Sequence, residues 1–197
     1  MTGPGPGPPG RLAGRLPRLG EALTATAEAV AFARRQASDL PDRPEAWRWV
    51  AIALTMALQG ACIAALLAYD TADPADILAP EDRASGATPP KLAPVALLLR
   101  RVTSSTHLAD PDRLPFTASR KQSVLDFVAY RNAAAHILPL STVPGPEELP
   151  RLAEAVIDAL THLCVTHPAF DPAVHPAPVK SLSDDLSGLA GRMAKLP

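Results

Sequence analysis

Residues 47–69 read WRWVAIALTMALQGACIAALLAY, and this stretch decides the fold. From Trp49 to Tyr69 there is no charged side chain, and only Thr55 and Gln59 are distinctly polar. More than half of the run is alanine and leucine, which are strong helix formers. The stretch therefore predicts one long apolar helix. We place it at about 44–69, because a proline suits the first helical turn.

Two environments suit such a helix. A bilayer span needs about 20 apolar residues, and Trp47, Trp49 and Tyr69 at the two ends resemble the aromatic belts of membrane helices. Against a span, alanine adds little insertion energy, and Gln59 and Gly60 place polarity at the centre of the run. A helix buried on all sides in a bundle, or at a dimer seam, shows the same pattern. We favour burial without a membrane, with Gln59 bonded to a neighbouring helix or to a dimer mate.

The composition of the whole chain favours an all-α fold. Aromatic residues, which are enriched in β-strands, make up only 4% of the 197 residues. This length allows one helical domain with a real core, plus tails. The formal net charge is −1, which excludes a global basic field. Any contact with nucleic acid must therefore use a local basic patch.

Apolar periodicity and breaker residues divide the chain into three parts. Residues 1–19, rich in glycine and proline, are expected to be a disordered tail, residues 20–167 a helical domain, and residues 168–197 a linker with a short amphipathic helix. We expect four to five core helices in the domain, and one helical turn near Ile77. The predicted helices are Glu21–Ser38, Pro44–Tyr69, Leu92–Ser105, Thr117–Leu138, Glu147–His167 and the short helix at 181–196.

The predicted short helix carries its leucines on one stripe, so it either docks on the bundle or binds a partner; we favour docking. Cys62 and Cys164 lie in apolar helical runs, which indicates free buried thiols and a reducing cytoplasm. The first 20 residues contain no continuous apolar core, so we expect no secretory signal.

The one chemically informative motif is Arg131-Asn132-Ala133-Ala134-Ala135-His136. Asn132 is the only asparagine in the chain and directly follows Arg131. On an ideal helix Arg131 and His136 are about 140° apart, whereas Asn132 and His136 share a face. We expect the Asn132 amide to hold the imidazole, and Arg131 to reach round on its long side chain.

These three residue types suit the cleavage of RNA. The ribose 2′-hydroxyl can attack the adjacent phosphorus without a metal, a histidine can transfer the protons, and an arginine can stabilise the charge of the transition state. The candidate catalytic residues are therefore Arg131, His136 and Asn132, with no metal and no cofactor. One copy supplies one histidine, so a two-fold dimer would supply both the acid and the base. An exposed helix end, with Arg131 and His136 near the negative end of the helix dipole, remains the structural alternative.

At these residues the chain resembles the HEPN superfamily, and Val124 to Tyr130 are similar to the family's apolar approach to the motif. The resemblance covers about residues 20–167, although only the motif is specific. It implies a bundle of four to five helices and an endoribonuclease site at a homodimer interface, often in toxin–antitoxin or phage-defence systems with a partner protein. Some family toxins have a tyrosine shortly after the histidine, modified by a partner nucleotidyltransferase. Here Ile137-Leu138-Pro139 follows, which weakens the expectation of such a partner.

Four further basic residues are candidates for flanking an RNA cleft: Arg100, Arg101, Arg120 and Lys121. A solvated surface is the alternative for them. Two other functions stay open for the chain, a non-catalytic HEPN-like module that binds RNA or a nucleotide, and a membrane-anchored helical protein that uses residues 49–69. The histidines near residue 165 do not share one helix face, so we expect no metal site there.

Overall fold

The chain folds into a bundle of helices, as its composition predicts. The computed structural model describes residues 19–69, 72–80, 91–136, 143–167 and 176–196. Within these ranges there is no β-strand, only an isolated antiparallel bridge between Leu78 and Leu92. The tail predicted at 1–19 lies outside the described residues except for Leu19, which begins the first helix.

The predicted helices are present with some changed bounds. Among the described residues the α-helices are α1 (Leu19–Ala37), α2 (Trp47–Leu66), α4 (Val95–Val102), α5 (Ala118–Ala135), α6 (Leu149–Thr161) and α7 (Pro176–Met193). Three 3₁₀ turns accompany them, at Pro44–Ala46, Pro74–Ile77 and Pro146–Glu148, and a π-helical turn at His162–Thr166 follows α6. The turn predicted near Ile77 is therefore confirmed.

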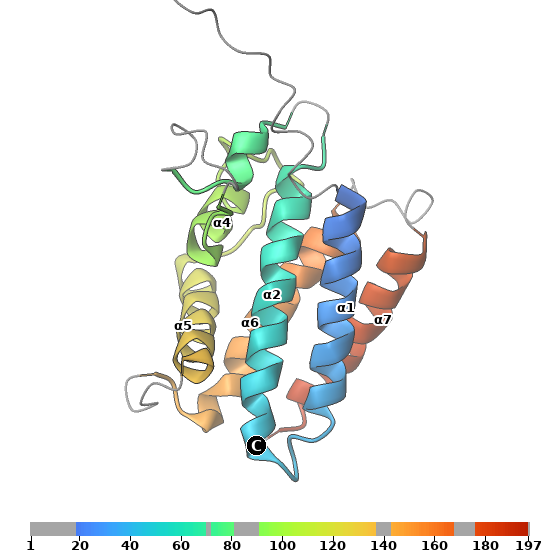
Figure 1. Cartoon of the computed structure of the whole chain (residues 1–197), viewed down its shortest axis with the longest axis vertical. Coiled ribbons are helices and arrows are strands. Elements are labelled where there is room, and N and C mark those ends of the chain that lie inside the picture. The colour runs from blue at the N-terminus through green and yellow to red at the C-terminus, as the bar shows by residue number, and fades with distance from the viewer. Residues whose placement is uncertain (1–18, 70–71, 81–90, 137–142, 168–175, 197) are drawn as a thin grey trace, which may run out of the picture.

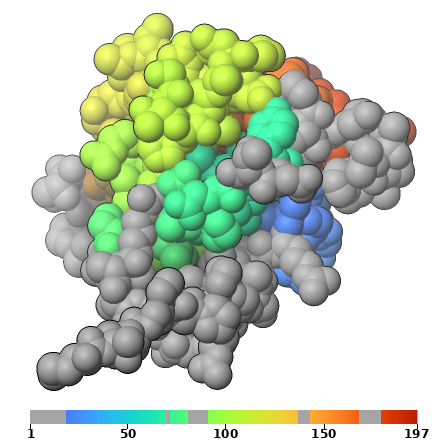
Figure 2. Space-filling view, turned by 90° about the horizontal axis from the view of Figure 1, so that it is seen from above, coloured from blue at the N-terminus to red at the C-terminus, as the bar shows by residue number. Residues whose placement is uncertain are grey.

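Four long helices form a ring in which α1 packs on α2, α2 on α6, α6 on α7, and α7 on α1. Helix α5 packs against α2 and α6 from outside this ring, and the short α4 lies at the upper end of α2 and α5 (Figure 1). The view from above shows the α4 region and α1 on opposite sides of the upper end of α2 (Figure 2). Helices α2 and α6 run upward and α1, α5 and α7 run downward, so the last turn of α5 and the first turn of α2 lie at the same, lower end (Figure 1).

The central position of α2 explains its long apolar run. Together with the 3₁₀ turn before it, this helix is long and apolar enough to cross a membrane, but 72% of its most apolar window is buried inside the fold. The Gln59 side chain donates a hydrogen bond to the carbonyl oxygen of Ala93 at 3.3 Å. Gln59 thus bonds within one copy to the segment just before α4, rather than to the neighbouring helix or dimer mate that was expected. Burial in the bundle accounts for the run without a membrane.

The C-terminal helix α7 docks on the bundle, as predicted. Its stripe at Val179, Leu182, Leu186, Leu189 and Met193 is buried, and the helix packs on α1 and α6. An ion pair between Arg34 and Asp185, 2.6 Å long, joins α1 to α7 at the edge of this interface. The helix begins at Pro176 rather than at residue 181, because prolines are tolerated in the first turn of a helix.

Helix α4 is shorter than predicted at both ends. Its first residues were expected at Leu92, but the backbone of 91–93 pairs with residues 77–79 instead, with Ala93 N donating to Ile77 O at 2.9 Å. Pro94 then caps the helix, which ends at Val102. This pairing fixes the loop after α2 against α4, and it creates the wall of a pocket described below.

Candidate functional site

The Arg131 motif lies at the C-terminal end of α5. The Thr117 hydroxyl caps the start of this helix by accepting a hydrogen bond from the Arg120 backbone N–H at 3.2 Å. Arg131 and Asn132 stand in the last turn, and His136 is the C-cap, with φ −98° and ψ 7°. Its backbone N–H still donates to the Asn132 carbonyl at 3.1 Å. The helix therefore ends at the histidine, while the predicted continuation to Leu138 lies outside the described residues.

Arg131 is held partly inside the fold. It follows the buried Phe127 by four residues, so its side chain starts from the inner side of α5 and is half-buried. One terminal nitrogen, Nη1, donates a 2.9 Å hydrogen bond to the Asn132 side-chain oxygen. The Nε atom is buried and has no hydrogen-bond partner among the described residues. An anion that reaches this guanidinium would therefore meet donors that have spare bonding capacity.

Asn132 and His136 are both exposed. Within the described residues the Asn132 amide does not bond to the imidazole, because its oxygen accepts from Arg131 instead. Asn132 therefore orients Arg131 in this structure, and its predicted contact with His136 is not made. Within the motif, the arrangement offers a positioned guanidinium and a solvent-accessible imidazole on different sides of one helix end.

The four basic candidates for an RNA cleft do not gather beside the motif. Arg120 and Lys121 stand in the first turn of α5, and eleven residues separate Arg120 from Arg131, which is about 16 Å along a helix. Arg120 forms an ion pair with Asp158 of α6, and Lys121 is half-buried. Arg100 is exposed on α4 at the same upper end.

Arg101 corrects the expectation of an exposed basic cluster. Its side chain is buried, with 5% of the residue exposed. The Nη1 atom donates to the carbonyl oxygens of Asp76 at 2.7 Å and of Leu78 at 3.0 Å. The guanidinium therefore fixes the loop after α2 to α4, and it offers no exposed surface for a polynucleotide.

The structure adds one pair of residues to the lower end of the bundle. The Arg48 guanidinium lies 5.3 Å from the centre of the Trp49 ring, and Trp49 is 46% exposed. Both belong to the first turn of α2, which lies at the same end of the bundle as the last turn of α5 (Figure 1). An exposed indole beside an arginine can stack on a nucleobase. In the sequence, Trp47 and Trp49 resemble an aromatic belt only, and the sequence did not show which of the two would be exposed.

A second polar cluster lies at the C-terminal ends of α2 and α6, where the sequence predicted none. The Tyr69 hydroxyl donates a hydrogen bond to the Asp112 carboxylate, and the imidazole Nε2 of His162 lies 3.3 Å from the Asp112 carbonyl oxygen. The ring of His167 is 6.2 Å from that of Tyr69, and His167 is 2% exposed. These residues come from three distant segments of the chain, so the spacing of residues in the sequence could not predict that they form a cluster.

The pKa values in this cluster follow from its contacts. The hydrogen bond to Asp112, with burial and the Asp112 charge, raises the pKa of Tyr69 to about 12. Burial lowers the pKa of His167; the nearby Asp112 carboxylate opposes this, and His162 adds to it. Tyr69 therefore stays protonated at neutral pH, and the cluster is built to hold a neutral His167 inside the fold.

Among the described residues, no group of three or more His, Cys, Asp or Glu side chains could hold a metal ion. No protein-family model, curated protein or solved structure matches the chain. The motif is therefore interpreted from its own chemistry and geometry.

Proposed function

We propose that the chain is an endoribonuclease that cleaves RNA by attack of the 2′-hydroxyl, with Arg131 and His136 as catalytic residues. The observation that carries the proposal is the half-buried Arg131 guanidinium, held by Asn132 and with an unpartnered Nε within the described structure, five residues before an exposed imidazole.

The reaction assigns one role to each residue. The O2′–P bond forms as the P–O5′ bond breaks, one proton leaves O2′, and one is delivered to O5′. Arg131 stabilises the extra negative charge on the phosphorane-like transition state. His136 transfers a proton, since imidazole titrates near neutral pH. Asn132 positions Arg131, and the chemistry itself needs no metal or cofactor.

A homodimer completes the proposal, because one copy supplies one motif histidine. Trp49, Ile52 and Met56 follow one another at helical spacing on the outer side of α2, and Met56 is 56% exposed. This face begins at the same end of the bundle as His136 (Figure 1). A two-fold axis parallel to α2 would bring both motifs to one end. An axis perpendicular to α2 would separate them by roughly the length of that helix, about 30 Å.

A cleavage assay tests the proposal. Purified protein is incubated with total RNA in EDTA, beside Arg131→Ala, His136→Ala and the control Arg192→Ala, which changes an arginine of α7. We expect the wild type and Arg192→Ala to cut, and the two motif variants to lose cleavage by at least a hundredfold. Products should end in a 2′,3′-cyclic phosphate, and a DNA strand of the same sequence should stay intact. Equal cleavage by a folded motif variant would overturn the proposal.

A second candidate is a non-catalytic module that binds RNA through the same motif. It is favoured by the Asn132 amide, which bonds to Arg131 and leaves the imidazole without an orienting partner from this residue. This alternative predicts no cleavage by the wild type. It also predicts weaker RNA binding on loss of Arg131 or His136, which filter binding at two salt concentrations measures.

The cellular setting is proposed on the resemblance to HEPN proteins. We propose a cytoplasmic protein in a toxin or phage-defence system, with an antitoxin or other defence protein as its partner. Free buried thiols at Cys62 and Cys164 suit a reducing compartment. Co-expression with proteins encoded beside it would test the partnership, through relief of growth arrest.

A further inference from the structure

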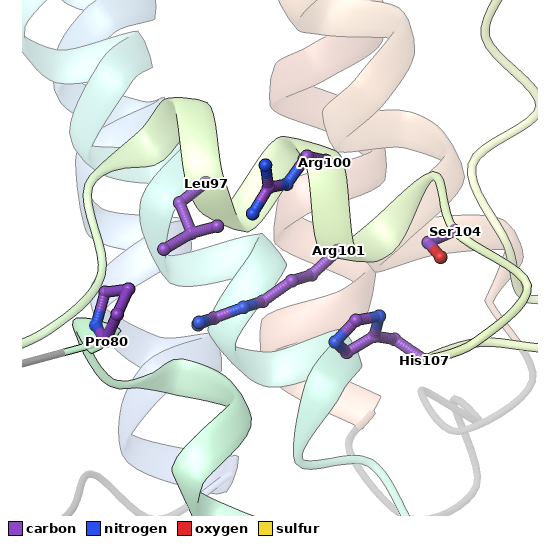
Figure 3. A pocket seen from close by; sticks show the side chains of 6 residues that line it. All are labelled: Pro80, Leu97, Arg100, Arg101, Ser104 and His107. Carbon is purple, nitrogen blue, oxygen red and sulfur yellow. The ribbon is translucent and has the colours of Figure 1, made fainter. Parts of the chain in front are cut away.

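A pocket of about 360 Å³ lies at the upper end of the bundle, away from the Arg131 motif (Figure 3). Its walls come from α4, the turn that follows α4, and the segment after the 3₁₀ turn at Pro74–Ile77. The lining residues are Pro80, Leu97, Arg100, Arg101, Ser104 and His107. The volume lies at the lower end of the range for small-molecule sites, roughly 300–1,000 Å³.

The pocket is lined mainly by side chains that attract anions. Arg100 is exposed, and its guanidinium has no ion pair or hydrogen bond among the described residues. The buried Arg101 also lines the pocket, and it donates hydrogen bonds to the carbonyl oxygens of Asp76 and Leu78. In Figure 3 its side chain runs past Leu97 toward Pro80, along the floor of the pocket. Two guanidinium groups on one small pocket are an arrangement that phosphate oxygens match well.

His107 supplies a further polar group. Its Nδ1 atom is buried and has no hydrogen-bond partner within the described ranges. The other nitrogen, Nε2, lies 3.7 Å from a carboxylate oxygen of Asp76. The backbone turn that carries it is closed by the His107 N–H, which donates to the Ser104 carbonyl at 3.1 Å. The pocket therefore contains an imidazole with an unused nitrogen within the described ranges, which is the kind of group that a ligand satisfies.

The remaining walls are apolar, formed by Leu97 and Pro80. None of the described lining residues is acidic, and the nearest carboxylate among the described residues that contacts them is that of Asp76, beside His107. A ligand that fits this distribution carries a negative group at one end and a flat or apolar body at the other. The size of the pocket favours a small molecule and excludes the groove that a polynucleotide backbone would need.

We propose that this pocket binds a small phosphate ester of the nucleoside monophosphate class. Arg100 and Arg101 contact the phosphate, Ser104 and His107 complete its hydrogen bonds, and Leu97 with Pro80 covers the body of the ligand. The proposal does not rest on ribonuclease activity, because the motif at the end of α5 takes no part in this pocket.

Isothermal titration of the full chain with adenosine monophosphate, inorganic phosphate and adenosine tests the proposal. We expect the monophosphate to bind, phosphate to bind more weakly, and adenosine to show no binding. Arg100→Gln should lower the affinity for the monophosphate by roughly ten- to a hundredfold, which is the effect of losing one hydrogen bond to a charged group. Ser104→Ala should weaken it less, by severalfold. The matched control, Arg192→Gln, should bind as the wild type does.

Four results would overturn the proposal: no binding of the monophosphate, equal binding of adenosine, unchanged binding by Arg100→Gln, or loss of binding in Arg131→Ala. The last result would place the ligand on the motif of α5 instead. Arg101 is left unchanged in this design because it holds the loop after α2 in place. Circular dichroism of each variant confirms that it is folded, so that a loss of binding is assigned to the pocket.

Discussion

Arg100 and Arg101 are adjacent in the sequence, but their side chains differ in burial. Arg101 is buried and bonded to two backbone carbonyls, whereas Arg100 is exposed. Removing a charged donor from buried carbonyls leaves them unsatisfied, at about 1–3 kcal/mol each. We therefore expect Arg101→Gln to lower the free energy of unfolding by about 2–4 kcal/mol, and Arg100→Gln to change it by less than about 0.5 kcal/mol. Urea unfolding of both variants measures this, and equal stabilities would contradict the structural role of Arg101.

His167 gives the bundle a dependence on pH. Burial lowers its pKa below the ordinary value of 6.5, so the unfolded chain binds this proton more readily than the folded chain. The contribution of the neutral His167 to the free energy of unfolding is complete above about pH 6.5. Stability falls as the pH decreases below that value. Urea unfolding at pH 7.5, 6.5 and 5.5 should show this fall in the wild type. His167→Gln and His167→Phe, which do not titrate, should show a flatter profile, and an unchanged slope in both would refute the assignment.

At the scale of helices, Gly60 marks a close approach of α1 and α2. A Cβ atom on Gly60 would collide with the Thr26 hydroxyl, which is buried and donates to the Ala22 carbonyl at 2.7 Å. We expect Gly60→Ala to destabilise the fold by about 1–3 kcal/mol through overpacking. Gly191 in α7 has no atom within 4 Å of such a Cβ, so Gly191→Ala should be neutral or stabilising by up to about 1 kcal/mol. Thermal unfolding ranks the two, and the opposite order would contradict the close approach.

The sequence predicted the positions of the helices better than the contacts between segments that are distant in the chain. Apolar spacing located α2 and the stripe of α7 because core packing imposes a period that residue types record. The shortened α4 was missed, since its cause is backbone pairing of residues 91–93 with 77–79, which no local pattern encodes. The motif was placed correctly at the end of α5, whereas the burial of Arg101 depends on carbonyls 23 and 25 residues away. Contacts between distant segments also explain why the Asp112 cluster was not foreseen.

At the scale of the whole molecule, the proposed homodimer would use the outer face of α2. Trp49 and Met56 lie two helical turns apart on that face, at 46% and 56% exposure. We expect the chain to be a dimer, and Met56→Glu to convert it to a monomer with at least tenfold less RNA cleavage, because a charge is costly in an apolar interface. Sedimentation and the cleavage assay measure both effects. A wild type that stays monomeric at tens of micromolar would contradict the dimer.

In the proposed homodimer the two motifs meet at one end, which predicts the direction in which the two α2 helices pair. If α2 pairs with its mate in parallel, every position on the two-fold seam faces its own copy. Trp49→Cys and Met56→Cys should then each form disulfide-linked dimers. In an antiparallel pair at most the position near the crossing point would do so. The native thiols do not interfere, because Cys62 and Cys164 are buried and burial raises the pKa of both. Cross-linking at one position alone would indicate antiparallel pairing. The two motifs would then lie at opposite ends of the dimer, and each site would have to work with a single His136.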